Sequence, residues 1–231
     1  ALGFSAGGLS PWIAAAIGVI AGVVIGMLAE FYTSADYKPA QLLANASTEG
    51  PALTITQGLA LGMKSCMAPC VILAAGIIVS YKVSGMYGVS MAAMGMLSFV
   101  TATVSVDTYG PISDNAGGIA EMSELDESVR DITDKLDAVG NTTAAIGKGF
   151  AIGSAALTAL ALFVSYAQAV GLFESGINLL DYKVIVGMFV GGMLPFLFSA
   201  FTMDSVSKAA YKMIEEVRRQ FKTIPGISEE I

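Results

Sequence analysis

The feature that most constrains this chain is the length of its segments without a charged side chain. Six such runs cover residues 1–29, 50–63, 65–81, 83–106, 149–173 and 184–203, and a single lysine separates the second run from the third. About 20 apolar residues of helix are needed to cross the hydrocarbon core of a bilayer. Because backbone groups in lipid must form their hydrogen bonds internally, we expect these runs to be membrane-spanning helices.

Composition agrees with this interpretation. Of the 231 residues, 55% are hydrophobic, only 13% are charged and 26 are glycine, which is too apolar for an ordinary soluble domain. We predict an all-α, polytopic transmembrane bundle that forms a single membrane domain over residues 1–231. Its five spans are predicted at about 10–32, 54–80, 86–108 (extended to about 121), 149–171 (preceded by a cytoplasmic helix over about 130–148) and 184–204 (extended to about 222).

The basic residues predict the orientation of these spans. If the C-terminal segment is cytoplasmic, only Lys82 and Lys183 lie on the outer side, and the positive-inside rule favours this arrangement. The net charge of −7 argues against nucleic acid as a partner. The first span has neither a basic start nor an initiator Met, so we expect a fragment of a longer chain rather than a signal peptide. The nine basic residues predicted to be cytoplasmic are Lys38, Arg130, Lys135, Lys148, Lys208, Lys212, Arg218, Arg219 and Lys222.

Acids, amides and glycines concentrate in one region, between the third and fourth spans. The stretch DTYGPISDNAGGIAEM carries Asp107, Asp114 and Glu121 at a spacing of seven, so a helix that continues through Gly110-Pro111 would place all three on nearly one face. Further on, TDKLDAVGNTTAAIGKG has four polar residues on a shared helical face: Asp134, Asp137, Asn141 and Lys148. We expect two neighbouring helices that oppose carboxylates with an amide and an ammonium group.

This residue set indicates a type of ligand. Carboxylates at the end of a membrane span usually serve a cation or a proton path. Hard oxygen ligands in a chain without histidine favour Mg²⁺ or Ca²⁺ over zinc or copper, and a nearby lysine suits a phosphate group. The alternative is a solvated loop whose acids only keep it wet. Spacing alone leaves both interpretations open.

The two polar motifs, together with EEVRRQFKTIPG and more weakly GMLAEFYTSADYKP and GLALGMKS, resemble the membrane-bound, ion-pumping inorganic pyrophosphatases. The resemblance covers nearly the whole chain. It implies a fold of sixteen transmembrane helices, of which this chain would supply the ninth to thirteenth, with its third and fourth spans among the six inner helices. It also implies a homodimer in which the remaining helices complete the pump, so the fragment alone is expected to be inactive.

The same resemblance assigns roles to residues. Asp114 would be a Mg²⁺ ligand, while Asn141 and Lys148 would contact the metal-pyrophosphate substrate. Asp107 and Glu121 belong to the same motif as further candidate metal ligands. The carboxylates that hold the attacking water and the ionisable residues of the gate would lie outside this sequence.

Two small residues bear on potassium. Members of that family that are indifferent to K⁺ are similar to this sequence but have Lys at the position of Ala144 and Thr at that of Gly147. The chain is therefore identified with the K⁺-dependent subclass, although both residues are also small enough to serve helix packing alone. The expected function is Mg²⁺-dependent hydrolysis of pyrophosphate at a cytoplasmic site, coupled to outward transport of H⁺ or Na⁺. The alternative is a non-enzymatic cation channel or secondary transporter subunit.

Overall fold

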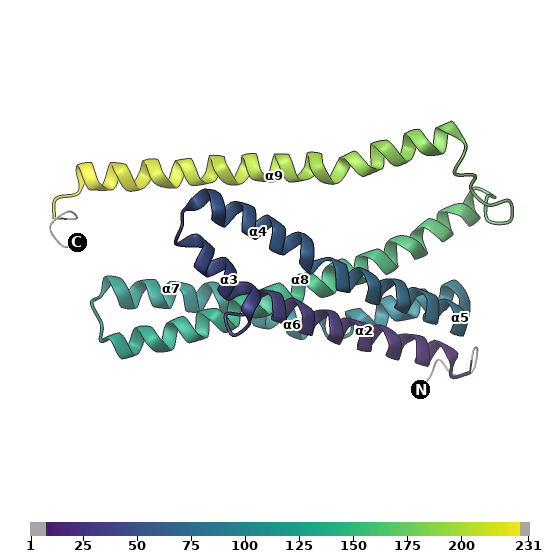
Figure 1. Ribbon diagram of the computed structural model, residues 1–231, viewed down its shortest axis with the longest axis horizontal. Coiled ribbons are helices and arrows are strands. Elements are labelled where there is room, and N and C mark those ends of the chain that lie inside the picture. The colour runs from purple at the N-terminus through teal and green to yellow at the C-terminus, as the bar shows by residue number, and fades with distance from the viewer. Residues whose placement is uncertain (1–7, 227–231) are drawn as a thin grey trace. The chain divides into compact units, whose positions relative to one another are not determined.

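A computed structural model describes residues 8–226, and the regular structure in this range is entirely α-helical (Figure 1). The prediction of an all-α chain is therefore confirmed. Contacts divide the chain into two compact units, one ending at Ala169 and the other beginning at Val170. The helices of the first unit are α2 (Ser10–Thr33), α3 (Lys38–Ser47), α4 (Pro51–Ser65), α5 (Met67–Leu97), α6 (Val100–Asp107), α7 (Tyr109–Met122) and α8 (Glu127–Ala169).

Small residues hold α2 against α5. A Cβ atom on Gly18 would lie 1.9 Å from the Ala92 carbonyl oxygen, and one on Gly95 would lie 2.0 Å from the Ala15 carbonyl oxygen. Only residues without a Cβ allow two backbones to approach this closely. The core of the unit forms around these contacts, where α2, α5 and α8 meet; it contains Ala21, Ile25, Leu73, Val89, Ala92, Ala93, Met96 and Leu157.

Helix α5 contains a reversal of the chain. Ser84 and Gly85 have non-helical dihedral angles, and Gly85 has a φ of 59°, which favours glycine. After the reversal, a Cβ on Gly88 would lie 2.3 Å from the Ser80 carbonyl oxygen. The two halves of α5 therefore pack closely against each other, at the position where the sequence predicts the loop between the second and third spans.

Pro111 does not end the helix that follows. Thr108, between α6 and α7, keeps right-handed helical dihedral angles, so the two helices follow each other with one break in the hydrogen-bonding pattern. Proline lacks the N–H that would bond to the Asp107 carbonyl oxygen, which accounts for the break. The predicted extension of the third span to about residue 121 corresponds to α7, and the helix predicted before the fourth span corresponds to the first half of α8.

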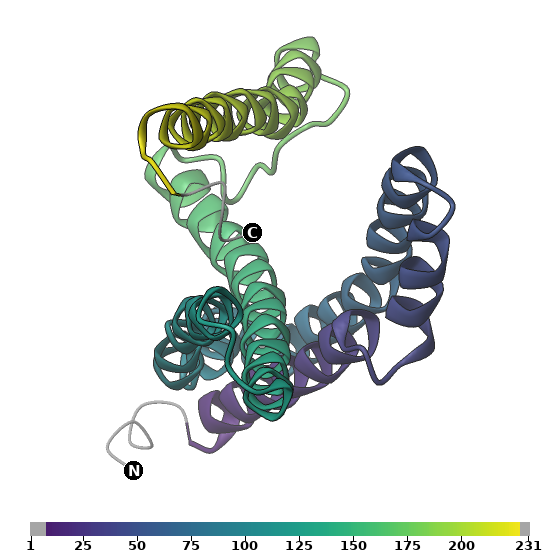
Figure 2. The same ribbon diagram turned by 90° about the vertical axis from the view of Figure 1, so that its left-hand side faces the viewer.

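The short helices α3 and α4 form a hairpin beyond the end of α2. Pro39 and Pro51 lie in the first turns of these helices, where a missing N–H costs little. Gly50 joins them with a φ of 123°, a conformation that L side chains rarely adopt. In Figure 2 the hairpin stands away from the packed part of α2, α5 and α8.

Four helical stretches of the described chain are long and apolar enough to cross a membrane: Ser10–Ser47, Pro51–Met122, Glu127–Ala169 and Tyr182–Thr223. The predicted spans at 10–32, 54–80, 86–108 and 184–204 lie inside these stretches, and the span predicted at 149–171 runs two residues past the end of the third. The second stretch includes the reversal at Ser84 and Gly85 and thus contains two of the predicted spans.

The second unit contains helix α9 (Tyr182–Thr223). Asp181 caps its N-terminus by accepting a hydrogen bond of 2.9 Å from the Lys183 backbone N–H. None of its residues is buried within the described chain, although its first half is strongly apolar. That surface must be covered by lipid or by other protein segments.

The contact between Gly18 and Ala92 gives a test of this packing. Gly18→Val should lower the temperature of thermal unfolding of the detergent-extracted protein, because its side chain would overlap the Ala92 backbone; such overpacking costs about 1–3 kcal/mol or more. Gly62→Val is the matched control, since no atom lies within 4 Å of a Cβ at that position. Equal unfolding temperatures for the two variants would contradict the close approach of α2 and α5.

Candidate functional site

The candidate site lies between α6/α7 and α8, which run antiparallel in a regular register. Contacts join Gly147 to Thr103, Gly140 to Gly110, and Gly117 to Thr133, so each step of seven residues along one helix matches a step of seven along the other. The closest point is the middle one, where a Cβ on Gly140 would lie 2.5 Å from the Gly110 Cα. Two helical turns separate successive contacts, as in a coiled coil.

A polar pocket of about 360 Å³ surrounds this closest point. It brings together residues from both polar motifs of the sequence. Asp107, Asp114, Asp137 and Asn141 supply its oxygen and amide groups, and Ala144 lies at its edge. Its remaining lining residues are Gly110, Pro111 and Gly140. The Asn141 amide donates a hydrogen bond of 2.9 Å to the Asp137 carboxylate.

We call Asp107, Asp114 and Glu121 the acidic row. The register places it opposite three residues of α8: Ala144, Asp137 and Arg130. Glu121 forms an ion pair with Arg130. The same spacing of seven then matches Asp114 with Asp137 and Asp107 with Ala144, and these four residues all line the pocket. Only Glu121 thus faces a cationic side chain. The other two positions of the row leave negative charge without a protein cation opposite it.

Arg130 joins the tips of α7 and α8. Besides Glu121, its guanidinium pairs with Asp134 at 2.7 Å and donates a 3.2 Å hydrogen bond to the Gly117 carbonyl oxygen. We call this set the Arg130 latch. It provides a cationic partner for Glu121 on α7 and for Asp134 on α8.

The turn between α7 and α8 is a Schellman motif. The Leu125 N–H bonds to the Ala120 carbonyl oxygen and the Glu124 N–H to that of Glu121, with Glu124 in the left-handed region at a φ of 50°. Asp126 then accepts hydrogen bonds from the Ser128 side chain and from its backbone N–H, which lower the pKa of the Asp126 carboxyl. These contacts begin α8 directly after α7 and keep the two helices antiparallel.

Three predicted site residues, Glu121, Lys148 and Gly147, lie outside the pocket. Glu121 is held in the Arg130 latch, and Lys148 is exposed on α8 two helical turns beyond Asn141. A Cβ atom on Gly147 would lie 3.4 Å from the Thr103 side chain, so Gly147 lies in the seam between α6 and α8. Within residues 8–226, no three carboxylate or thiol side chains come close enough to hold a metal ion by themselves.

Sequence reasoning missed three contributors to this site. It placed Asp137 on the polar face but did not match it with Asp114, and it gave no role to Gly140 or to Arg130. The repeated spacing of seven between Gly110 and Gly117, and between Gly140 and Gly147, was the available signal for the seam. No comparable spacing in the sequence indicated that Arg130 pairs with Glu121 on the neighbouring helix.

Helices long enough to span a membrane, two of which continue into an antiparallel pair with opposed carboxylates, define a polytopic membrane protein with a polar site at the end of its spans. The family model described as inorganic H⁺ pyrophosphatase matches residues 4–231. The chain belongs to this family.

Curated relatives support the assignment. The chain is 60% identical over 231 residues to a putative K⁺-stimulated pyrophosphate-energized sodium pump of Clostridium tetani, covering 96% of this chain and 34% of the relative. It is 52% identical to the K⁺-stimulated pyrophosphate-energized sodium pump of Thermotoga maritima, covering 99% and 33%. It is 47% identical to the K⁺-insensitive pyrophosphate-energized proton pump of Methanosarcina mazei, covering 92% and 33%. The chain thus spans about a third of the length of these relatives.

The Arg130 latch can be tested by proteolysis. Arg130→Met should make the turn at residues 123–126 more accessible, because the two helix tips lose their ionic contact; cleavage there should be roughly two- to five-fold faster. Arg219→Met is the matched control, since Arg219 pairs with Glu216 within α9 alone. If Arg130→Met, Arg219→Met and the unmodified protein are all cleaved at the same rate, the Arg130 latch does not hold the turn.

Proposed function

We propose that this chain is the part of a pyrophosphate-energised ion pump that supplies one wall of its hydrolytic site. The complete pump would couple hydrolysis of inorganic pyrophosphate to outward transport of H⁺ or Na⁺. The observation that carries the proposal is a pocket lined by both Asp114 and Asp137, which form no ion pair within residues 8–226, in a chain of this family. A passive channel would have no use for pyrophosphate, so phosphate release by the complete protein separates the two functions.

Opposed carboxylates are unfavourable unless a cation lies between them. Two negative charges that line the same pocket repel each other, and a cation bound between them relieves this repulsion. Asp114, Asp137 and Asn141 offer oxygen ligands of the hard type that Mg²⁺ prefers. Mg²⁺ usually takes one or two carboxylates and completes its shell with water and substrate phosphate, so a site without three protein ligands fits it.

Bound Mg²⁺ would neutralise charge on pyrophosphate and on the phosphate that leaves. In our proposal, Asp114 is a metal ligand and Asp107 extends the negative surface that attracts the metal. Asn141 and Lys148 would contact the metal-pyrophosphate substrate, with the exposed ammonium of Lys148 available to a phosphate oxygen. Glu121 would act mainly through the Arg130 latch, which fixes the end of the acidic row.

We further propose how the chain is placed in the membrane. It would cross five times, with the two halves of α5 in separate crossings, and correspond to the ninth to thirteenth helices of the pump. The tips of α7 and α8 would face the cytoplasm, which agrees with the excess of basic residues on that side. The remaining helices of the pump would supply the water-holding carboxylates, and a second copy would complete a homodimer that covers exposed apolar surface such as that of α9.

Potassium has a physical place in this arrangement. Asp107 faces Ala144, whereas Glu121 two steps further along the acidic row faces Arg130. A lysine at position 144 would place an ammonium group where the register leaves negative charge uncompensated. With alanine there, a monovalent cation such as K⁺ can supply the same charge. Two of the relatives described above are named as K⁺-stimulated, which supports the proposal.

The metal role of Asp114 predicts a shift in Mg²⁺ dependence. In the complete pump, Asp114→Asn should raise the Mg²⁺ concentration for half-maximal phosphate release by about ten-fold or more and should lower turnover, because an amide is a weaker ligand than a carboxylate. The matched control is Asp131→Asn, since Asp131 forms no hydrogen bond or ion pair with the described residues. An unchanged Mg²⁺ dependence and rate for Asp114→Asn would refute the assignment.

The potassium proposal predicts that a lysine at position 144 removes the K⁺ dependence of phosphate release. Ala144→Lys should make the rate of the complete pump largely independent of K⁺ while its Mg²⁺ dependence remains, since the new ammonium replaces the bound cation. Phosphate release is measured with K⁺ varied at constant ionic strength. Ala144→Met is the control for side-chain length without charge, and it should not confer independence. A parent pump with the same rate at zero and saturating K⁺ would overturn this proposal.

A further inference from the structure

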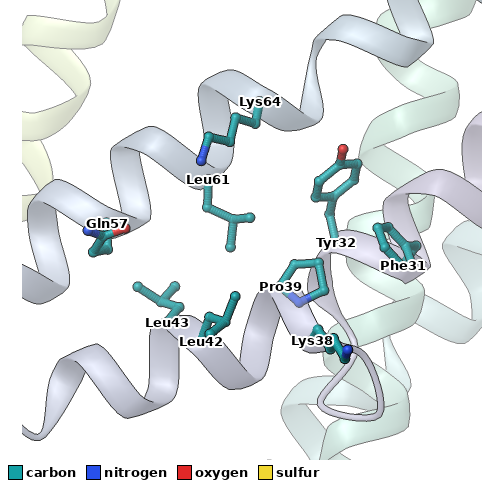
Figure 3. Close-up of a pocket in the computed structure, with 9 residues that line it drawn as sticks. All are labelled: Phe31, Tyr32, Lys38, Pro39, Leu42, Leu43, Gln57, Leu61 and Lys64. Atoms are coloured by element: carbon teal, nitrogen blue, oxygen red, sulfur yellow. The ribbon is translucent and has the colours of Figure 1, made fainter.

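A second pocket lies at the end of α2, between that helix and the α3/α4 hairpin (Figure 3). Its volume is about 260 Å³. The Lys64 side chain reaches from α4 toward Leu61, and the Tyr32 hydroxyl points toward α4 from the other side. We call it the Lys38/Lys64 pocket; its lining residues are Phe31, Tyr32, Lys38, Pro39, Leu42, Leu43, Gln57, Leu61 and Lys64.

The pocket combines positive charge with an apolar wall. Lys38 and Lys64 form no ion pair or hydrogen bond through their ammonium groups within residues 8–226, and no carboxylate lines the pocket. Tyr32 and Gln57 add polar groups that can donate hydrogen bonds. The leucine and proline side chains form the rest of the wall. A ligand that fits must therefore be anionic at one end and apolar at the other.

The fold places this pocket at the membrane border. The end of α2 also lines a polar pocket with residues 135–146 of α8, so it lies at the same end of the unit as the candidate site. Sequence alone places Lys64 well inside a span, but in the structure it lines the same pocket as Tyr32 and Lys38, on the side formed by α4 (Figure 3). Tyrosine and lysine are the residues that favour the interface between lipid and water.

We propose that the Lys38/Lys64 pocket binds an anionic phospholipid. The two ammonium groups, one on each side of the pocket, would attract its phosphate, and the first carbons of its acyl chains would lie against Leu42, Leu43 and Leu61. Basic pockets between transmembrane helices on the cytoplasmic side are typical sites for anionic headgroups. The volume suits a headgroup and the start of its chains rather than a whole lipid, whose tails continue into the bilayer. This inference depends on the membrane placement proposed above and not on pyrophosphate hydrolysis.

A lipid fits better than the other occupants of such a pocket. Free phosphate would use the lysines but leave the leucine wall exposed to water. Another helix of the pump would have to bring a carboxylate to each lysine, because buried ammonium groups need a partner. The headgroup of an anionic lipid can pair with the lysines while its acyl chains cover the leucine side chains, and lipid surrounds every membrane protein.

The test uses the complete pump purified in detergent, titrated with short-chain phosphatidylglycerol, short-chain phosphatidylcholine or inorganic phosphate. The thermal unfolding midpoint gives the half-saturating concentration of each. Phosphatidylglycerol should bind most tightly, and Lys38→Gln with Lys64→Gln should weaken it by about ten- to thirty-fold. Lys38→Arg with Lys64→Arg should retain binding. The matched control is Lys82→Gln with Lys183→Gln, two lysines of the predicted outer side, which should change nothing.

A second measurement does not depend on any variant. Native mass spectrometry of the unmodified pump, extracted from vesicles with equal phosphatidylglycerol and phosphatidylcholine, should show retained phosphatidylglycerol. Equal retention of both lipids, or of neither, would overturn the proposal. So would inorganic phosphate binding as tightly as phosphatidylglycerol, which would assign the pocket to a free anion. An unaltered affinity in the glutamine variant would show that another segment fills the pocket.

Discussion

Close approach of backbones at glycine is the interaction on which the rest of this structure depends. In lipid no hydrophobic force brings helices together, so association relies on van der Waals contact between main chains that lack intervening side chains. Gly18 against Ala92 fixes α2 on α5 in this way, and beyond the predicted spans Gly140 against Gly110 brings α8 equally close to α7. Each contact leaves no room for a shifted register. The glycines therefore decide which polar residues face one another, although they carry no chemistry themselves.

The electrostatics of the site follow from that register. With Gly140 against Gly110, the acidic row meets arginine at one position, aspartate at the next and alanine at the last. A shift by one residue would separate Asp114 from Asp137 and move Arg130 away from Glu121. The acidic row thus has a specific charge pattern: Arg130 neutralises Glu121, and in our proposal Asp114 and Asp107 are left for a metal ion and a monovalent cation.

Much of this arrangement could be predicted from the sequence, and the remainder has an identifiable reason. The spacing of seven between Asp107, Asp114 and Glu121 already placed them on one face, since Pro111 removes one hydrogen bond without ending the helix. What opposes each acid could not be predicted, because that depends on the contact between two glycines on different helices. The position of Lys64 could not be predicted for the same reason. It depends on where α2 ends, and the apolar residues around Lys64 carry no information about that end.

The same helices that carry the proposed site continue into segments long and apolar enough to cross a membrane. Below the contact of Gly110 with Gly140, the seam continues to Thr103 and Gly147, at the border of the predicted spans. Because α8 is one helix of 43 residues, and α6 and α7 follow each other with helical geometry, a change in their separation at the pocket must reach the membrane segments. Charge bound between Asp114 and Asp137 favours approach of the helices, and its release favours separation. If the chain has the function proposed above, binding and hydrolysis of pyrophosphate in the complete pump would act on ion transport through the spacing of these two helices.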